Sequence, residues 1–420
     1  MKKLLYYSIL FVAFLSACKK DGIDKYPIET SFTDPNVPLA TYKTALASSA
    51  DGWKVILTPA KSGLYGGYIK FETTGDAKFV LDNTVTAAGT PATSNYTLNI
   101  YKTNPSISFA KGSAFSAFAL NSTLGIDTSF TFKSAKGDTI QLLGNLQGSN
   151  LTLIKSTKQE SDDYLAGKMA TPITIASTIN SFKLYYKRFA MGGKNYDLIL
   201  NTKTKTISFN YSSNGVFTRF ASNYYYNSDG GITLKQAFTD GSNTISSLNS
   251  LTVDVPNNKA TFTTGNATTI AIANFAAPVI ADLAAPRRFY SNPTNGTNWL
   301  SYTGFTVDGV TDAYKVTTIS NFNYLVYYPN LTAVYDRLGF IVNNAYAAYG
   351  PAIQTGITTD GRIVTFFYAS YGTPPAVYTT IVNATRDKLV DATGFYVFQT
   401  GANTYDWVNA KDGRSWISFE

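Results

Sequence analysis

The sequence predicts a protein built mostly of antiparallel β-sheets, and three observations support this fold class. Threonine supplies 54 of the 420 residues, with 30 tyrosines and 27 phenylalanines, and such side chains fit a pleated, half-buried surface. Glutamate, a good helix former, occurs only four times. Short apolar runs separated by glycine-containing turns recur along the chain, which is typical of β-hairpins. We therefore expect a sandwich or a partly open barrel in two blocks, with a few short helices.

The chain begins with a segment typical of a bacterial lipoprotein signal peptide. Two lysines precede a mostly apolar stretch at residues 4–15, which is too short to cross a bilayer. Leu15-Ser16-Ala17-Cys18 follows and resembles a lipobox, in which two small residues precede the cysteine that takes the diacylglycerol. Cys18 is the only cysteine in the sequence. We expect residues 1–17 to be removed and Cys18 to be lipidated. The alternatives are an ordinary secretory signal with a chance cysteine and a short membrane anchor.

The charged segment after Cys18 indicates which face of the membrane carries the protein. Lys19-Lys20-Asp21 resembles the surface-export signal of Bacteroidetes lipoproteins, although Gly22 stands where an acid is usual. The segment favours the outer face of the outer membrane, and a solvated charged linker is the other interpretation. Residues 18–38 contain three prolines and are expected to form a tether between the lipid and the fold.

The first β domain is expected at residues 39–167. Leu39, Tyr42 and Leu46 recur at helical spacing, which predicts one short amphipathic helix at its start. Strands and turns alternate from residue 53 onward. A polar segment at residues 159–167 predicts a short helix or a hinge at the end of this domain.

The second β domain is expected at residues 168–420, where the same pattern of strands and turns continues. Asp360-Gly361 and Asp412-Gly413 are typical turn pairs between apolar runs. The sequence contains no repeat of fixed period, so a propeller or a solenoid is not expected.

Several short motifs together resemble one protein family. They are Gly52-Trp53, Gly66-Gly67-Tyr68, the segment DTIQL at residues 138–142 and the closing segment WISF at residues 416–419. In this order they are similar to the domain-of-unknown-function 4302 family of Bacteroidetes lipoproteins, best over residues 39–165. Families of this kind commonly occur in loci that encode outer-membrane nutrient importers, so the resemblance implies capture of a glycan or a peptide. It brings no catalytic residues with it.

The composition excludes many kinds of chemistry. Histidine is absent, which rules out Ser-His-Asp and Cys-His machinery and histidine-ligated zinc or haem. One cysteine allows neither an internal disulfide nor a cysteine-cluster metal site. Phosphate-binding and nucleophile-elbow motifs are missing, so we expect no cofactor, no metal site and no enzyme. The net charge of 35 − 27 = +8 is diffuse, and we expect no nucleic-acid partner.

Two other functions stay open on the sequence alone. A glycoside hydrolase needs only two carboxylates about 5–9.5 Å apart, and 23 aspartates could provide them. An outer-membrane β-barrel would also be rich in tyrosine and phenylalanine, although the lipobox argues against it.

The best candidates for ligand contact are Trp299 and Tyr302. They follow a loop-like stretch that contains Asn292, Asn295 and Asn298, whose amides can both donate and accept hydrogen bonds. Loops on a rigid sheet often carry binding residues. The alternative is that Trp299 opens the next strand and points into the core.

The interpretation that joins these observations is a lipid-anchored protein of the cell surface. We expect a non-catalytic binding or accessory component of outer-membrane nutrient capture. Its partners would be the outer membrane, through the lipid on Cys18, a glycan or peptide ligand, and importer proteins.

Overall fold

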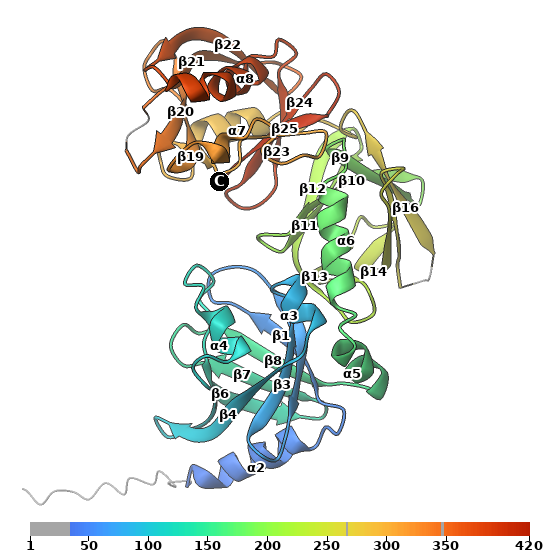
Figure 1. Ribbon diagram of the computed structural model, residues 1–420. Coiled ribbons are helices and arrows are strands. Elements are labelled where there is room, and N and C mark those ends of the chain that lie inside the picture. Colours follow the sequence, from blue (N-terminus) through green and yellow to red (C-terminus); the bar gives the residue numbers. More distant parts are fainter. Residues whose placement is uncertain (1–33, 266–267, 346–347) are drawn as a thin grey trace, which may run out of the picture.

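The computed structural model describes residues 34–265, 268–345 and 348–420, which form three antiparallel β-sheets (Figure 1). Strands make up 46% of the described residues and helices 17%, so the prediction of a mostly β, antiparallel fold is confirmed. The predicted leader, most of the tether and Cys18 lie outside the described residues. The predicted first domain corresponds to one sheet, whereas residues 168–420 contain two. No helix in the described part of the chain is both long and apolar enough to span a bilayer.

The first sheet is a closed barrel of eight strands in chain order, because β1 pairs with both β2 and β8. Its strands are β1 (Trp53–Thr58), β2 (Tyr65–Phe71), β3 (Asp76–Leu81), β4 (Ala92–Tyr101), β5 (Asn104–Phe109), β6 (Ser129–Lys136), β7 (Thr139–Gly144) and β8 (Asn150–Lys155). Alternation along β1 buries Trp53, Val55 and Leu57 inside the barrel. Two short helices, α3 (Val85–Gly89) and α4 (Ala114–Ala119), join its strands.

The predicted amphipathic helix is confirmed as α2 (Asn36–Ala47), which packs on the first barrel. Leu46 on this helix is buried, and its carbonyl oxygen accepts a hydrogen bond from Nε1 of Trp53 at 3.0 Å. Tyr42 stacks on Phe132 of β6 with ring centroids 4.4 Å apart. The helix is therefore held by contacts that reach into the barrel core.

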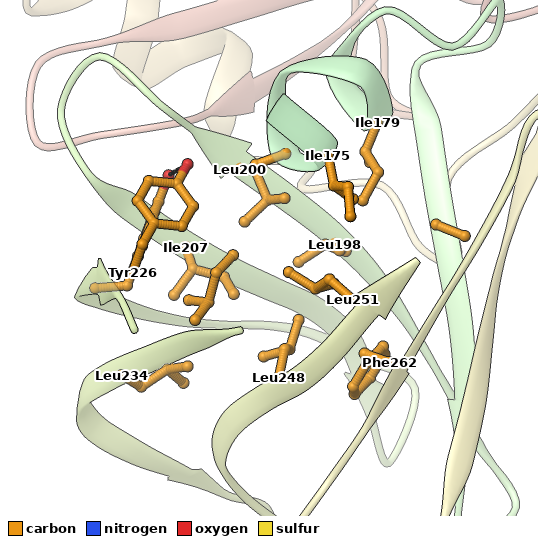
Figure 2. Packing of buried hydrophobic residues seen from close by; sticks show 14 of the residues in the cluster. Ile175, Ile179, Leu198, Leu200, Ile207, Tyr226, Leu234, Leu248, Leu251 and Phe262 are labelled. Atoms are coloured by element: carbon orange, nitrogen blue, oxygen red, sulfur yellow. Dashed lines mark hydrogen bonds between the residues drawn. The ribbon is translucent and has the colours of Figure 1, made fainter. Parts of the chain in front are cut away.

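Two helices connect the first barrel to the second. The first is α5 (Lys158–Leu165), which begins with a capping box between Thr157 and Glu160. The second is α6 (Ala170–Asn180), whose Ile175 and Ile179 point toward leucines of the second barrel (Figure 2). The predicted helix or hinge at residues 159–167 is thus a helix, and the next helix helps to fill the core of the second barrel.

The second sheet is also a closed barrel of eight strands, because β9 pairs with both β10 and β16. Its strands are β9 (Tyr186–Met191), β10 (Lys194–Asn201), β11 (Thr206–Ser213), β12 (Val216–Tyr226), β13 (Ile232–Thr239), β14 (Thr244–Asp254), β15 (Lys259–Thr263) and β16 (Thr269–Phe275). Inward-facing aromatic and aliphatic side chains fill it, including Phe209, Phe238 and Phe262.

The third sheet has nine strands and curls back on itself. Its strands are β17 (Trp299–Ser301), β18 (Phe305–Val307), β19 (Phe322–Tyr328), β20 (Asp336–Val342), β21 (Gly350–Ile357), β22 (Arg362–Tyr371), β23 (Phe395–Gln399), β24 (Tyr405–Asn409) and β25 (Ser415–Phe419). Leu300, in the edge strand β17, and Glu420, just after β25 near the other edge, exchange two backbone hydrogen bonds of 3.0 and 2.9 Å. Helices α7 (Ala285–Ser291) and α8 (Thr379–Leu389) bury Phe289 and Leu389 in its core.

The two barrels are joined by a buried ion pair between Asp82, which follows β3, and Lys205, which precedes β11. Nζ of Lys205 lies 2.8 Å from a carboxylate oxygen of Asp82, and that oxygen also accepts the backbone N–H of Tyr226 at 2.9 Å. The rings of Tyr65 and Tyr226 face the ammonium group, with centroids 5.1 and 4.3 Å from Nζ. Burial pushes both groups toward neutrality, raising the pKa of Asp82 and lowering that of Lys205, and their mutual contact opposes both shifts.

We expect the losses of stability caused by removing the two partners of this pair to be strongly non-additive. Lys205→Met or Asp82→Asn leaves one buried polar group without its partner, which costs about 3–5 kcal/mol. The double variant should lose clearly less than the sum of the single losses in urea denaturation. Additive losses would show that the two residues act independently.

Candidate functional site

A cleft of about 360 Å³ lies where the second barrel meets the third sheet. Leu198 and Leu200 of β10 belong to the barrel core and also line the cleft, so it opens at the end of the barrel. The opposite wall comes from β24, β25 and the segment between β17 and β18. Barrel mouths and junctions between domains are common places for small-molecule sites, and the volume falls within the usual range of about 300–1,000 Å³.

Tyr185, just before β9, holds the two walls together. Its backbone N–H donates to the carbonyl oxygen of Gly413 at 2.8 Å, and its hydroxyl donates to the Asp406 carboxylate at 2.8 Å. Its ring meets Trp416 edge-on, with centroids 5.5 Å apart. The floor of the cleft is therefore a fixed arrangement of a phenol, a carboxyl group and an indole.

Lys187 extends from β9 into this arrangement. It is opposite Leu198 in the ladder with β10, and it shares the inward face of β9 with the buried Phe189. The residue is 6% exposed, and Nζ lies 5.1 Å from the ring centroid of Trp416 and 5.4 Å from that of Tyr185. Within the described residues, Lys187 forms neither a hydrogen bond nor an ion pair with another side chain. Burial lowers the pKa of Lys187 to about 7, against an opposing effect of the Asp406 charge.

Asp406, on β24, is the half-buried carboxyl group of the site. Burial raises its pKa, while hydrogen bonds from Ser418 and Tyr185 and the charge of Lys187 act in the opposite direction. The phenol of Tyr185 has its own pKa raised well above the usual value by burial and stays protonated at neutral pH. The cleft thus combines an amine and a carboxyl group whose pKa values have moved toward each other, a combination typical of functional sites.

The rim of the cleft is formed by an ion pair and an exposed ring. Nζ of Lys203 lies 2.6 Å from the carboxylate of Glu420, and both side chains reach solvent. The same Nζ lies 5.3 Å from the ring centroid of Tyr302, which is 45% exposed and meets Tyr324 edge-on. Threonine hydroxyls complete the lining, at positions Thr303, Thr306, Thr311, Thr400 and Thr404.

The structure separates the two residues that the sequence nominated for ligand contact. Tyr302 lies on the rim of the cleft, as a binding residue would. Trp299 is 1% exposed, stacks on Phe289 at 4.7 Å and donates from Nε1 to the Phe289 carbonyl oxygen at 3.0 Å. A ligand-binding role of Trp299 stays a prediction, and its buried ring gives that prediction no support.

The three asparagines near Trp299 lie on an exposed loop, as expected, but none of them is among the residues that line the cleft. Asn292 donates to the carbonyl oxygen of Arg288 at 3.0 Å, and Asn295 donates to Asn298 at 3.3 Å. Their amides therefore stabilise the loop itself.

Sequence reasoning missed Lys187, Tyr185 and Asp406 as site residues. One local signal was present, because Tyr185, Lys187 and Phe189 alternate along a strand and place a lysine at an inward position. The local signal for Asp406 is its position between the aromatic residues Tyr405 and Trp407, but its contact with Tyr185, 221 residues away, forms only in the folded protein.

Comparison with protein families identifies one match, to the model described as a domain of unknown function, DUF4302, over residues 36–252. The chain belongs to this family. The matched residues cover the first barrel, both connecting helices and the second barrel into β14, so the DUF4302 match includes Lys187 but not Asp406. No curated protein matches the chain.

Two solved structures with low similarity are beta subunits of DNA polymerase III. The DNA polymerase III beta chain of Streptococcus pneumoniae TIGR4 is 11% identical, over 92% of this chain and 97% of that one, with a TM-score of 0.14. The DNA polymerase III subunit beta DnaN sliding clamp of Bartonella birtlesii LL-WM9 is 7% identical, over 92% and 97%, with a TM-score of 0.12. Likeness at these TM-scores carries no argument about fold or function.

We expect Lys187→Met to stabilise the protein in a pH-dependent way. Below pH 7 both the folded and the unfolded lysine are protonated, so the folded state bears the whole cost of burying the charge. Between pH 7 and about 10.4 the unfolded lysine keeps a proton that the folded one has lost, so the wild type gains stability as pH rises.

The advantage of Lys187→Met should therefore be largest below pH 7 and shrink by up to about 1.4 kcal/mol per pH unit above it. Denaturation of both proteins from pH 6 to pH 10 measures this difference. An advantage that does not change with pH would contradict the lowered pKa. Lys203→Met is the matched control, because Lys203 lies at the exposed rim of the same cleft.

Proposed function

We propose that this protein is a lipid-anchored binding protein of the cell surface, which captures a glycan or a peptide for an outer-membrane importer and performs no catalysis. The observation that carries the proposal is the cleft between the second barrel and the third sheet. It combines ring faces with several hydroxyl and charged groups in a small volume.

The lining of the cleft suits a sugar ring better than an extended peptide. A sugar presents apolar faces that stack on aromatic rings and hydroxyl edges that need donors and acceptors. Tyr302 and Trp416 supply rings, and threonine hydroxyls supply both donors and acceptors. The limited volume favours one or two sugar rings over a longer ligand.

The arrangement of the three sheets fits an anchor at the amino terminus. Helix α2, the first described element, lies at one end of the molecule, and the third sheet lies at the other (Figure 1). A lipid on Cys18 would hold the first barrel nearest the membrane. The cleft, at the junction of the second barrel and the third sheet, would then lie far from it.

We expect Tyr302→Ala to weaken glycan binding about 5-fold to 150-fold while leaving thermal stability unchanged. The lost ring stacking is worth roughly 1–3 kcal/mol, taking base stacking as the guide. An oligosaccharide array identifies the ligand, and titration calorimetry measures the change in affinity. Trp299→Ala is the comparison, because loss of a buried tryptophan costs about 3–5 kcal/mol of folding stability. Equal binding by Tyr302→Ala and wild type, or release of reducing sugar from the array, would contradict the proposal.

We expect Cys18→Ala to abolish acylation and detach the protein from the membrane. Metabolic labelling with a fatty acid should mark the wild type and leave the variant unlabelled. An external protease should digest the wild-type protein on intact cells. Persistent labelling of Cys18→Ala would rule out lipidation at this residue, and protection from the protease until lysis would place the protein in the periplasm.

A further inference from the structure

We infer that Lys187 is a covalent docking point in the cleft, where its amine condenses reversibly with the aldehyde group of a small ligand, such as the open-chain form of a reducing sugar. The inference deepens the proposed function, since it assigns a ligand class to the same cleft.

The second barrel contains two buried lysines, and their surroundings differ. Lys205 is held by Asp82 at 2.8 Å and serves the junction of the two barrels. Lys187 is buried to a similar degree, but within the described residues it has no side-chain hydrogen bond or ion pair, and its Nζ lies near the rings of Tyr185 and Trp416. It also lines a cleft that a small molecule can enter. A buried amine that is aimed into a cavity and left without a polar partner is available to a ligand.

The protonation state of Lys187 suits a nucleophile. Its pKa of about 7 leaves about half of the amine neutral at pH 7, whereas an ordinary lysine has roughly one neutral amine in 2,500. The neutral form carries the lone pair that attacks a carbonyl carbon. Desolvation of a lysine in an apolar pocket is one of the recognised ways to activate it for this chemistry.

The condensation balances without an oxidant or a reductant. Nζ forms a bond to the aldehyde carbon, the carbonyl electron pair moves to oxygen, and that oxygen takes up a proton. The carbon–oxygen bond then breaks, water leaves, and the nitrogen loses its protons to give the imine. Asp406 lines the same cleft, is held by the Tyr185 hydroxyl and affects the pKa of Lys187 through its charge, so it is the group we assign to deliver the proton to the departing oxygen.

Reductive trapping tests the inference directly. The full-length protein is incubated at pH 7 with glycolaldehyde and sodium cyanoborohydride, and peptide mass spectrometry follows the modification of each lysine. We expect Lys187 to be modified at least tenfold faster than Lys203, which lies at the rim of the same cleft and is paired with Glu420. Lys187→Met should remove the fast modification, and Lys203→Met should retain it.

Asp406→Asn examines the role of the carboxyl group. This change removes a negative charge near Lys187, so it increases the neutral fraction of the amine. If Asp406 delivers the proton, modification should nevertheless slow about tenfold. Unchanged or faster modification would show that Asp406 has no part in the step.

The outcomes separate this inference from the proposed function. Modification of Lys187 no faster than that of Lys203 overturns the inference, and binding of a glycan that depends on Tyr302 would still stand. Fast modification of Lys187 supports the inference, even if the array shows no ligand that depends on Tyr302. Circular dichroism of each variant confirms that a loss of modification does not reflect unfolding.

Discussion

The buried contact between Asp82 and Lys205 fixes the relation between the two barrels, and the adjoining backbone is shaped to permit it. A Cβ atom on Gly66 would lie 2.5 Å from the Tyr225 ring and 2.7 Å from the Tyr226 carbonyl oxygen, so a larger residue would push the barrels apart. The backbone N–H of Asp82 donates to the carbonyl oxygen of Gly66 at 3.1 Å. The glycine that allows close approach therefore also helps to orient the carboxylate of the ion pair.

This junction accounts physically for the motif Gly66-Gly67-Tyr68. A Cβ atom on Gly67 would lie 2.3 Å from the carbonyl oxygen of Val80, so the neighbouring strand also requires glycine there. The hydroxyl of Tyr68 lies 2.8 Å from that of Ser161 on α5 and donates to the carbonyl oxygen of Asp51 at 2.9 Å. Three consecutive residues thus connect the first barrel to the second barrel and to α5.

The sequence was sufficient to predict elements that depend on local interactions. Gly361 and Gly413 have φ values of +81° and +66°, which glycine adopts without steric cost. Each of them follows an aspartate, a residue that also favours turns. Closure of each barrel could not be predicted, because it depends on pairing between the first and last strands, such as β1 with β8. The division of residues 168–420 into two sheets could not be predicted either, because it also depends on which distant strands pair. Alternation predicts which face a residue takes, but not which distant strand it meets.

The candidate site shows the same limit. Trp299 is the first residue of β17, and its side chain is buried in the core. Tyr302 lies just after the end of β17, so the alternation of buried and exposed side chains along the strand does not apply to it, and it is exposed. Proximity in sequence therefore did not mean a shared surface. The cleft is assembled from the end of one barrel and the last strands of another sheet, so only the folded chain brings Lys187 and Asp406 together.

The energetics of the two buried lysines indicate which junction has a structural role and which has a functional one. The pKa of Lys187 is lowered from 10.5 to about 7. At about 1.4 kcal/mol per pKa unit, burying the charged amine therefore costs roughly 5 kcal/mol. Cation–π contact with the two neighbouring rings offsets about 2 kcal/mol of this cost. That net cost is a large share of a typical folding stability of about 5–15 kcal/mol. Lys205, the other buried lysine of this barrel, is paired with the carboxylate of Asp82 at the junction of the two barrels. Leaving Lys187 unpaired at a cleft is therefore better explained by what enters the cleft than by what holds the protein together.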